Sequence, residues 1–310
     1  MKKFAMSAIA VAAVLGAGAA NAYTSGTFKN GFVVPNVIKN DTTGATTAVG
    51  IINKTGTPGQ VTSVYWTFFD QDSKHITDGC FPMTYNDYEP FVWNTANSGA
   101  LMDGKRGYLV FAAGNTASSA AGTCTNTETA PNSNGLLSAQ AIYVEPANKD
   151  VAYTPVIDGN LTVTGASTLR AMGPDSLTTV AGAAQIGTDA HFSMRYYVDG
   201  AKGGNDTNIV VWSTGDQTGS HTVLMYDDKQ GVKSVNFDLT RKELDWFDVE
   251  TISGRPANFT DGFIDWDASV PPATDAPATG ALASGGSVFT YSLVSAPAFG
   301  ALQTILGAHR

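Results

Sequence analysis

Few side chains in this sequence are of the kinds that perform catalysis. The 310 residues include two cysteines and four histidines, and only 15% are charged. The chain has no Gly-x-Ser-x-Gly, His-Glu-x-x-His or Cys-x-x-Cys motif and no phosphate-binding glycine-rich loop. The local signatures of serine hydrolases, zinc proteases, dithiol oxidoreductases and nucleotide-binding proteins are therefore missing. No two histidines have the spacing of a metal-ligand pair. We expect a protein without enzymatic activity.

Long apolar runs are also missing, except at the amino terminus. The basic pair Lys2 and Lys3 precedes an apolar stretch over residues 4–15, and small residues follow at 20–22. This order is typical of a cleaved secretory signal, so we expect residues 1–22 to be removed. The mature chain would then be exported to the periplasm, the cell surface or the medium, and the two-lysine start favours a bacterial source. No later run reaches the roughly 20 apolar residues of a membrane-spanning helix, so no span is predicted in the mature chain.

Basic residues are scarce. Removal of the predicted signal takes away two lysines, which gives a formal charge of 18 − 2 − 27 = −11. Affinity for nucleic acid and for anionic lipid comes from lysine and arginine, so neither is an expected partner. Other copies of the chain and extracellular or cell-surface components are the partners we expect instead.

The two cysteines are Cys80 and Cys124. Export to an oxidising compartment favours a disulfide between them, with two isolated thiols as the alternative. The bridge would close a loop of about 45 residues and would stabilise the fold by about 3–4 kcal/mol in the chain-entropy model.

Internal similarity is the most prominent feature that the chain does have. Residues from Phe32 onward match residues from Phe192 onward over about a hundred positions, with an offset that drifts from 160 to 155. A repeat of this length is a domain rather than a solenoid unit. We expect one domain over 23–147 and another over 189–310, joined by a connector over 148–188. The connector contains short apolar runs, so we expect it to pack across both domains.

Apolar positions that both halves share are two residues apart. For example, Phe81 and Met83 match Phe237 and Leu239. This is the period of a strand with one buried face, and no long segment has helical periodicity. The predicted fold class is all-β, as two tandem, internally duplicated antiparallel β-sandwiches of immunoglobulin-like or jelly-roll-like type. A single larger sandwich with internal pseudo-symmetry is the alternative.

Acidic turns provide the candidate metal ligands, namely Asp70, Asp72, Asp78, Asp227 and Asp228. Carboxylate oxygens are the ligands that Ca²⁺ prefers, although the spacing is not that of an EF-hand loop. Aspartate is also an ordinary turn residue that hydrogen-bonds its own backbone. Turn chemistry is the favoured interpretation and Ca²⁺ the alternative, and no other cofactor is expected.

Aromatic residues provide a candidate sugar-binding surface. Four of the five tryptophans match apolar residues in the other half, which predicts that they fill cores. Trp246 instead matches Pro90, and Tyr196 and Tyr197 lie in mixed surroundings. These three aromatic residues are the candidate glycan contacts.

Together these features favour an exported, non-enzymatic protein that acts as a structural, adhesive or assembly component at the cell surface or outside the cell. A secreted carbohydrate-binding module and a secreted hydrolase with a site between the two domains are the alternatives.

Overall fold

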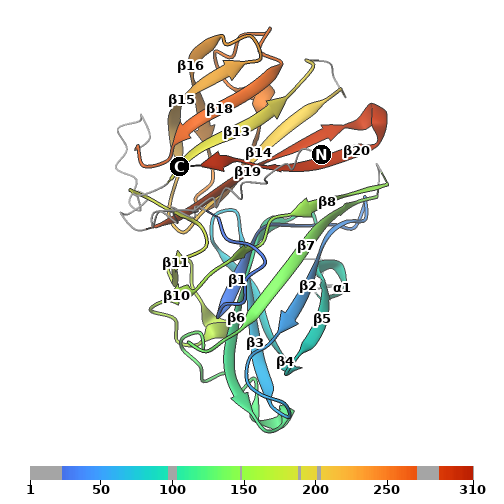
Figure 1. Ribbon diagram of the computed structural model, residues 1–310, viewed down its shortest axis with the longest axis vertical. Coiled ribbons are helices and arrows are strands. Elements are labelled where there is room, and N and C mark those ends of the chain that lie inside the picture. Colours follow the sequence, from blue (N-terminus) through green and yellow to red (C-terminus); the bar gives the residue numbers. More distant parts are fainter. Residues whose placement is uncertain are drawn as a thin grey trace, which may run out of the picture.

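The computed structural model describes residues 23–96, 103–146, 149–187, 190–200, 204–270 and 286–309. Within these ranges almost all regular structure is β-strand, and the single α-helix is the short α1 (Trp93–Ala96). The sheets are antiparallel and form two sandwiches stacked along the long axis of the molecule (Figure 1). The predicted all-β sandwich class is therefore confirmed. The predicted secretory segment, residues 1–22, lies outside the described residues.

The first sandwich, here called unit 1, has two four-stranded layers. Its strands are β1 (Gly31–Asn40), β2 (Ala45–Asn53), β3 (Val61–Asp70), β4 (His75–Thr84), β5 (Asp87–Val92), β6 (Arg106–Ala117), β7 (Leu137–Glu145) and β8 (Asp150–Thr154). Sheet A has the order β4-β3-β6-β1, and sheet B has the order β5-β2-β7-β8. β1 bulges between Val34 and Val37, and its last residues pair with β2, so this strand links the two sheets.

The second sandwich, unit 2, has the same layers. Its strands are β13 (His191–Tyr197), β14 (Asp206–Ser213), β15 (Gly219–Asp227), β16 (Val232–Leu239), β17 (Leu244–Asp248), β18 (Asp261–Asp267), β19 (Ser287–Ala296) and β20 (Ala301–Leu306). Sheet A has the order β16-β15-β18-β13, with β21 (Ala308–His309) added at its edge. Sheet B has the order β17-β14-β19-β20.

Strand order and register agree between the two units. Strand for strand, β1 to β8 occupy the positions of β13 to β20. Phe32 lies opposite Phe111 in the β1–β6 pair, and Phe192 lies opposite Trp266 in the β13–β18 pair. These are the residues that the sequence comparison matched. Residues at the same strand and register position are called equivalent below, while descent from one duplicated domain stays an inference from the sequence.

Each sandwich has its own core between its two sheets. In unit 1, Trp66 and Phe68 of sheet A pack with Phe91 and with Trp93, which follows β5. In unit 2, Met194, Phe237 and Trp266 of sheet A pack with Ile209 and Val211 of sheet B. Alternate residues of each strand enter these cores, as the period of two predicts.

The connector fills a third core between the units. It contains the short strands β9 (Ile157–Asp158), β10 (Leu161–Val163), β11 (Leu177–Val180) and β12 (Ala184–Gln185), and β8 also lies within the interval 148–188. Connector residues Leu169 and Val180 belong to one buried cluster with Tyr108 of unit 1 and with Trp212 and Phe289 of unit 2. The expectation that this segment packs across both units is confirmed.

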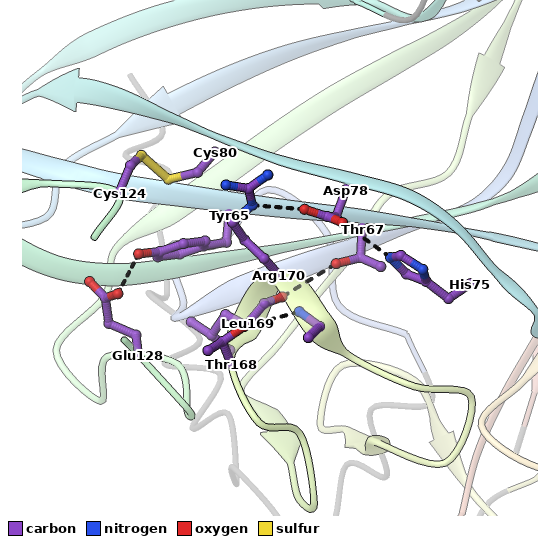
Figure 2. Close-up of polar contacts among 11 residues, drawn as sticks. Tyr65, Thr67, His75, Asp78, Cys80, Cys124, Glu128, Thr168, Leu169 and Arg170 are labelled. Carbon is purple, nitrogen blue, oxygen red and sulfur yellow. Dashed lines mark hydrogen bonds and ion pairs between the residues drawn. A yellow bond between two sulfur atoms is a disulfide. The ribbon is translucent and has the colours of Figure 1, made fainter. Parts of the chain in front are cut away.

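Polar contacts fasten the connector to the outer face of sheet A in unit 1 (Figure 2). The Arg170 guanidinium lies 2.7 Å from the Asp78 carboxylate, and the Thr67 hydroxyl donates to the Leu169 carbonyl at 3.3 Å. Tyr65 donates to Glu128 in the long loop before β7, and the carbonyl of Glu128 accepts the Leu169 N–H at 2.7 Å. The turn around Leu169 is therefore bonded both to sheet A and to the loop before β7.

A buried carboxyl group joins the units near the end of β3. Glu243 of unit 2 accepts a hydrogen bond from Tyr108 of unit 1 at 2.5 Å, and the Tyr108 and Ser73 hydroxyls are 2.7 Å apart. All three residues are buried. Burial raises the pKa of Glu243 to about 7, and the charges of Asp175 and Asp216 act in the same direction.

The stability of the protein should therefore fall as the pH rises from about 4.5 to about 7. In that window the folded state keeps the Glu243 proton that the unfolded state has lost, which costs at most about 3 kcal/mol by the top of the window. Glu243→Gln should remove most of this slope in chemical denaturation at pH 4.5, 6 and 8. A residual slope of the same sign is expected from Asp158, because burial raises its pKa to about 6. Equal slopes for both proteins would contradict the assignment.

Candidate functional site in the cleft between the two units

A cleft of about 400 Å³ lies where the outer face of sheet B in unit 2 meets unit 1. The residues that matter below are Asn36, Arg106 and Tyr143 from unit 1, and Asp206, Trp246 and Tyr291 from unit 2. Strands β8 and β20 close one side, where the Leu302 N–H donates to the Asp150 carboxylate at 2.6 Å (Figure 1). The cleft therefore exists only because the two units pack together.

Arg106 and Trp246 are in direct contact in the wall of this cleft. Arg106 is the first residue of β6, and its guanidinium carbon lies 3.0 Å from the centre of the Trp246 ring. Trp246 projects from β17 on the outer face of sheet B and is 37% exposed. A cation over an indole face is attracted by the ring quadrupole. This contact holds the indole in place while part of its surface stays open to the cleft.

Burial lowers the pKa of Arg106 to about 10, although Tyr291 and Tyr143 oppose the shift. No carboxylate of the described residues forms an ion pair with Arg106, and its Nη1 atom is buried without a hydrogen-bond partner. A buried guanidinium N–H that lacks an acceptor costs about 1–3 kcal/mol. The group is therefore ready to donate to an acceptor that enters the cleft.

Two acceptor atoms at the cleft also lack partners among the described residues. They are Oδ1 of Asn36 and Oδ1 of Asp206, and both are buried. The amide nitrogen of Asn36 donates to the Tyr291 hydroxyl at 3.0 Å, which fixes the direction of its free oxygen. Such unsatisfied buried groups are rare in folded proteins. One donor and two acceptors thus converge on one cavity.

Carboxylates gather on the unit 2 side of the cleft. Burial raises the pKa of Asp206, and the charges of Asp248 and Glu250 raise it further. Glu250 accepts the Gly200 N–H at 2.9 Å, and Asp248 accepts the Glu250 N–H at 2.6 Å, so backbone bonds hold both side chains. These acids give this side of the cleft acceptors for the hydroxyl groups of a ligand.

The three predicted glycan contacts do not form one surface. Trp246 lines the cleft. Tyr196 is buried in unit 2, and its hydroxyl donates to the Tyr226 carbonyl at 2.9 Å. Tyr197 is exposed on β13, which belongs to the opposite sheet of unit 2. Only Trp246 of this predicted set lies at the cleft.

The acidic turn residues bond their own backbone. Asp70 Oδ1 accepts the N–H groups of Asp72 and Lys74 at 3.0 and 2.9 Å. Asp227, at the equivalent turn of unit 2, accepts those of Lys229 and Gly231 at 3.0 and 2.5 Å. This is the turn chemistry that the sequence favoured.

The other predicted metal ligands have separate environments. Asp72 pairs with Arg241 at 3.0 Å, and Asp78 pairs with Arg170. The backbone N–H of Asp228 donates to the Asp261 carbonyl at 2.9 Å. Over the described ranges, no three histidine, cysteine or acidic side chains are grouped so that they could hold a metal ion.

Comparison of the chain with protein-family models, with curated proteins and with solved structures finds no match. Within the part of the chain that the structure describes, no helix has the length and apolarity needed to cross a membrane.

Proposed function

We propose that this is an exported, non-enzymatic adhesive protein that binds a saccharide in the cleft between its two sandwiches. One observation carries the proposal: Trp246, partly open and backed by Arg106, shares a cavity with three buried polar atoms that have no partner. Export and a bacterial source rest on residues 1–22 alone.

A sugar ring matches the chemistry of these groups. Its C–H face packs on an indole, and its hydroxyls both donate and accept hydrogen bonds. A hydroxyl or carboxylate oxygen would accept from Arg106, and hydroxyl protons would reach the free oxygens of Asn36 and Asp206. The cleft volume of about 400 Å³ lies within the roughly 300–1,000 Å³ that is usual for small-molecule sites.

Trp246→Ala should weaken saccharide binding at least about tenfold, because it removes the aromatic face and frees Arg106. Glycans that bind on an array of neutral and acidic oligosaccharides would be titrated by calorimetry. Unfolding stability should fall by no more than about 1 kcal/mol, the usual worth of a partly exposed cation–π contact. Tyr197→Ala is the matched control, since this exposed aromatic residue lies outside the cleft. Unchanged affinity for Trp246→Ala, or no binding by the native protein, would overturn the proposal.

The pair Asp206 and Asp248 gives a specific reason to test hydrolysis as a second function. Burial and a side-chain hydrogen bond with Asp248 raise the pKa of Asp206. A carboxyl group that keeps its proton beside an ionised carboxylate can provide a general acid and a general base for hydrolysis. Chromatography of oligosaccharides after incubation would reveal shortened products, and Asp206→Asn should abolish them. Binding without cleavage would leave the adhesive proposal alone.

A further inference from the structure

Each unit has two outer sheet faces, and only one outer face of each unit takes part in the contact between the units. Sheet A of unit 1 contributes its outer face, through Tyr65, Phe69 and Tyr108, and sheet B of unit 2 contributes its outer face, through Trp212 and Tyr291. The outer face of sheet B in unit 1 and the outer face of sheet A in unit 2 take no part in this core. Because the strand order is the same, these are the equivalents of the two faces that do pack.

An aromatic pair marks the contact face of unit 1. Phe69 and Tyr108 lie opposite each other in the β3–β6 pair, and their rings stack with centres 5.2 Å apart. Trp212 of unit 2 meets Tyr108 edge-on at 5.8 Å. Tyr108 is only 1% exposed as a result.

The same pair recurs in unit 2 without a cover. Tyr226 and Phe263 lie opposite each other in the β15–β18 pair, at the equivalent positions, and their rings stack with centres 4.6 Å apart. Phe263 is 37% exposed, and the neighbouring Leu224 and Val232 are exposed as well. An aromatic and aliphatic patch of this kind on a sheet face is typical of an interaction site.

Apart from this pair, the outer face of sheet A is more polar in unit 2 than in unit 1. Tyr65 and Val110 are buried in unit 1, and their equivalents in unit 2 are Thr222 and Asp265. Polar residues thus occupy in unit 2 part of the face that is buried in unit 1, while the stacked aromatic pair is present in both units. Tyr226 and Phe263 are therefore not simply part of a sheet face that is apolar throughout.

The complementary face in unit 1 is open too. Trp212 lies opposite Leu244 in unit 2, and the equivalent pair in unit 1 is Ile52 and Tyr88. Ile52 is 37% exposed and Tyr88 is 61% exposed. An apolar residue is thus present on unit 1 at the position of Trp212, and it is partly exposed where Trp212 is fully buried.

We infer that a second copy of this chain covers these faces. The Ile52 and Tyr88 face of one copy docks on the Tyr226 and Phe263 face of the next, in the way that Trp212 docks on Tyr108 within the chain. The two faces differ, so the contact is heterologous and leaves one free face at each end. The protein would therefore assemble head to tail into chains. This inference does not depend on the cleft, since Ile52 and Tyr88 do not line it and neither do Tyr226 and Phe263.

Two variants that each block one face provide the test. Phe263→Asp removes the aromatic patch of unit 2, and Ile52→Asp removes the partly exposed apolar residue of unit 1. Sedimentation velocity over a wide concentration range should show a ladder of oligomers for the native protein and monomers for either variant alone. An equimolar mixture of the two variants should give dimers and nothing longer, because each variant keeps one working face. Phe299→Asp, at a residue that is 82% exposed elsewhere, should assemble like the native protein.

Three results would overturn the inference. If the native protein stays monomeric, a second copy of the chain does not cover these faces. A native dimer that does not grow shows a symmetric contact, and a mixture that forms long chains shows a contact elsewhere. Circular dichroism and the melting temperature of each variant verify that it has folded, and Tyr88→Asp serves as a second block of unit 1 if Ile52→Asp does not fold. Saccharide binding should be unchanged in all these variants, so failure of this inference is distinguishable from failure of the proposed function.

Discussion

Replacement of Trp212 by alanine is expected to lower the free energy of unfolding by about 3–5 kcal/mol, the usual cost of truncating a buried aromatic residue. Trp212 is fully buried and contacts Tyr108 across the junction between the units. Its ring belongs to the third core together with connector residues such as Leu169. The cavity would therefore open between the two sandwiches rather than inside either one.

Because this cavity lies between the two sandwiches, Trp212→Ala should also change the number of unfolding transitions. If the third core couples the two sandwiches, calorimetry of the native protein should show one cooperative transition, and Trp212→Ala should split it into two. Trp66→Ala is the informative comparison, since Trp66 packs against Phe91 inside unit 1. That variant should destabilise unit 1 by a similar amount. A Trp212→Ala protein that melts in one transition at the native temperature would contradict the role of this core.

Trp212 also shows what the sequence comparison could and could not predict. A position that is apolar in both halves was expected to be buried, and Trp212 is buried, but on the outer face of its sheet. Its equivalent Ile52 is exposed. Period-two patterning separates the two faces of a strand, and it does not indicate which neighbour covers the outer face. Tertiary packing of two units decides that, and no local pattern encodes it.

The cleft was mostly beyond prediction for a related reason. Trp246 was singled out because it matches Pro90, and it does line the cleft. Arg106 and Asp206 each begin a strand and Asn36 lies at the bulge of β1, and the three polar residues have no distinctive spacing in the sequence. Their proximity follows from the arrangement of the units and the connector. The strand periods, by contrast, depend on local alternation, and the internal match depends on a direct comparison of the two halves. Both agree with the observed strands and registers.

Loss of the disulfide is expected to lower the free energy of unfolding by about 3–4 kcal/mol, because the bridge restricts the unfolded chain. Cys80 and Cys124 are joined as predicted, with Cα atoms 5.8 Å apart and a sequence separation of 44 residues. A double variant, Cys80→Ser with Cys124→Ser, avoids a free thiol and can be compared with native protein by chemical denaturation. Unreduced native protein should also have a mass two hydrogens below that of the dithiol.

The disulfide should protect one region more than the rest of the molecule. Cys80 lies on β4, and Cys124 lies in the loop whose Glu128 binds both Tyr65 and the backbone of Leu169 (Figure 2). Without the bridge this loop and the Leu169 turn lose a shared anchor. Hydrogen exchange should therefore accelerate there first, while unit 2 keeps its protection, since Asn236 stands at the position of Cys80 and no bridge exists in that unit. Uniform acceleration across both units would mean that the bridge acts only through the unfolded chain and does not hold the connector.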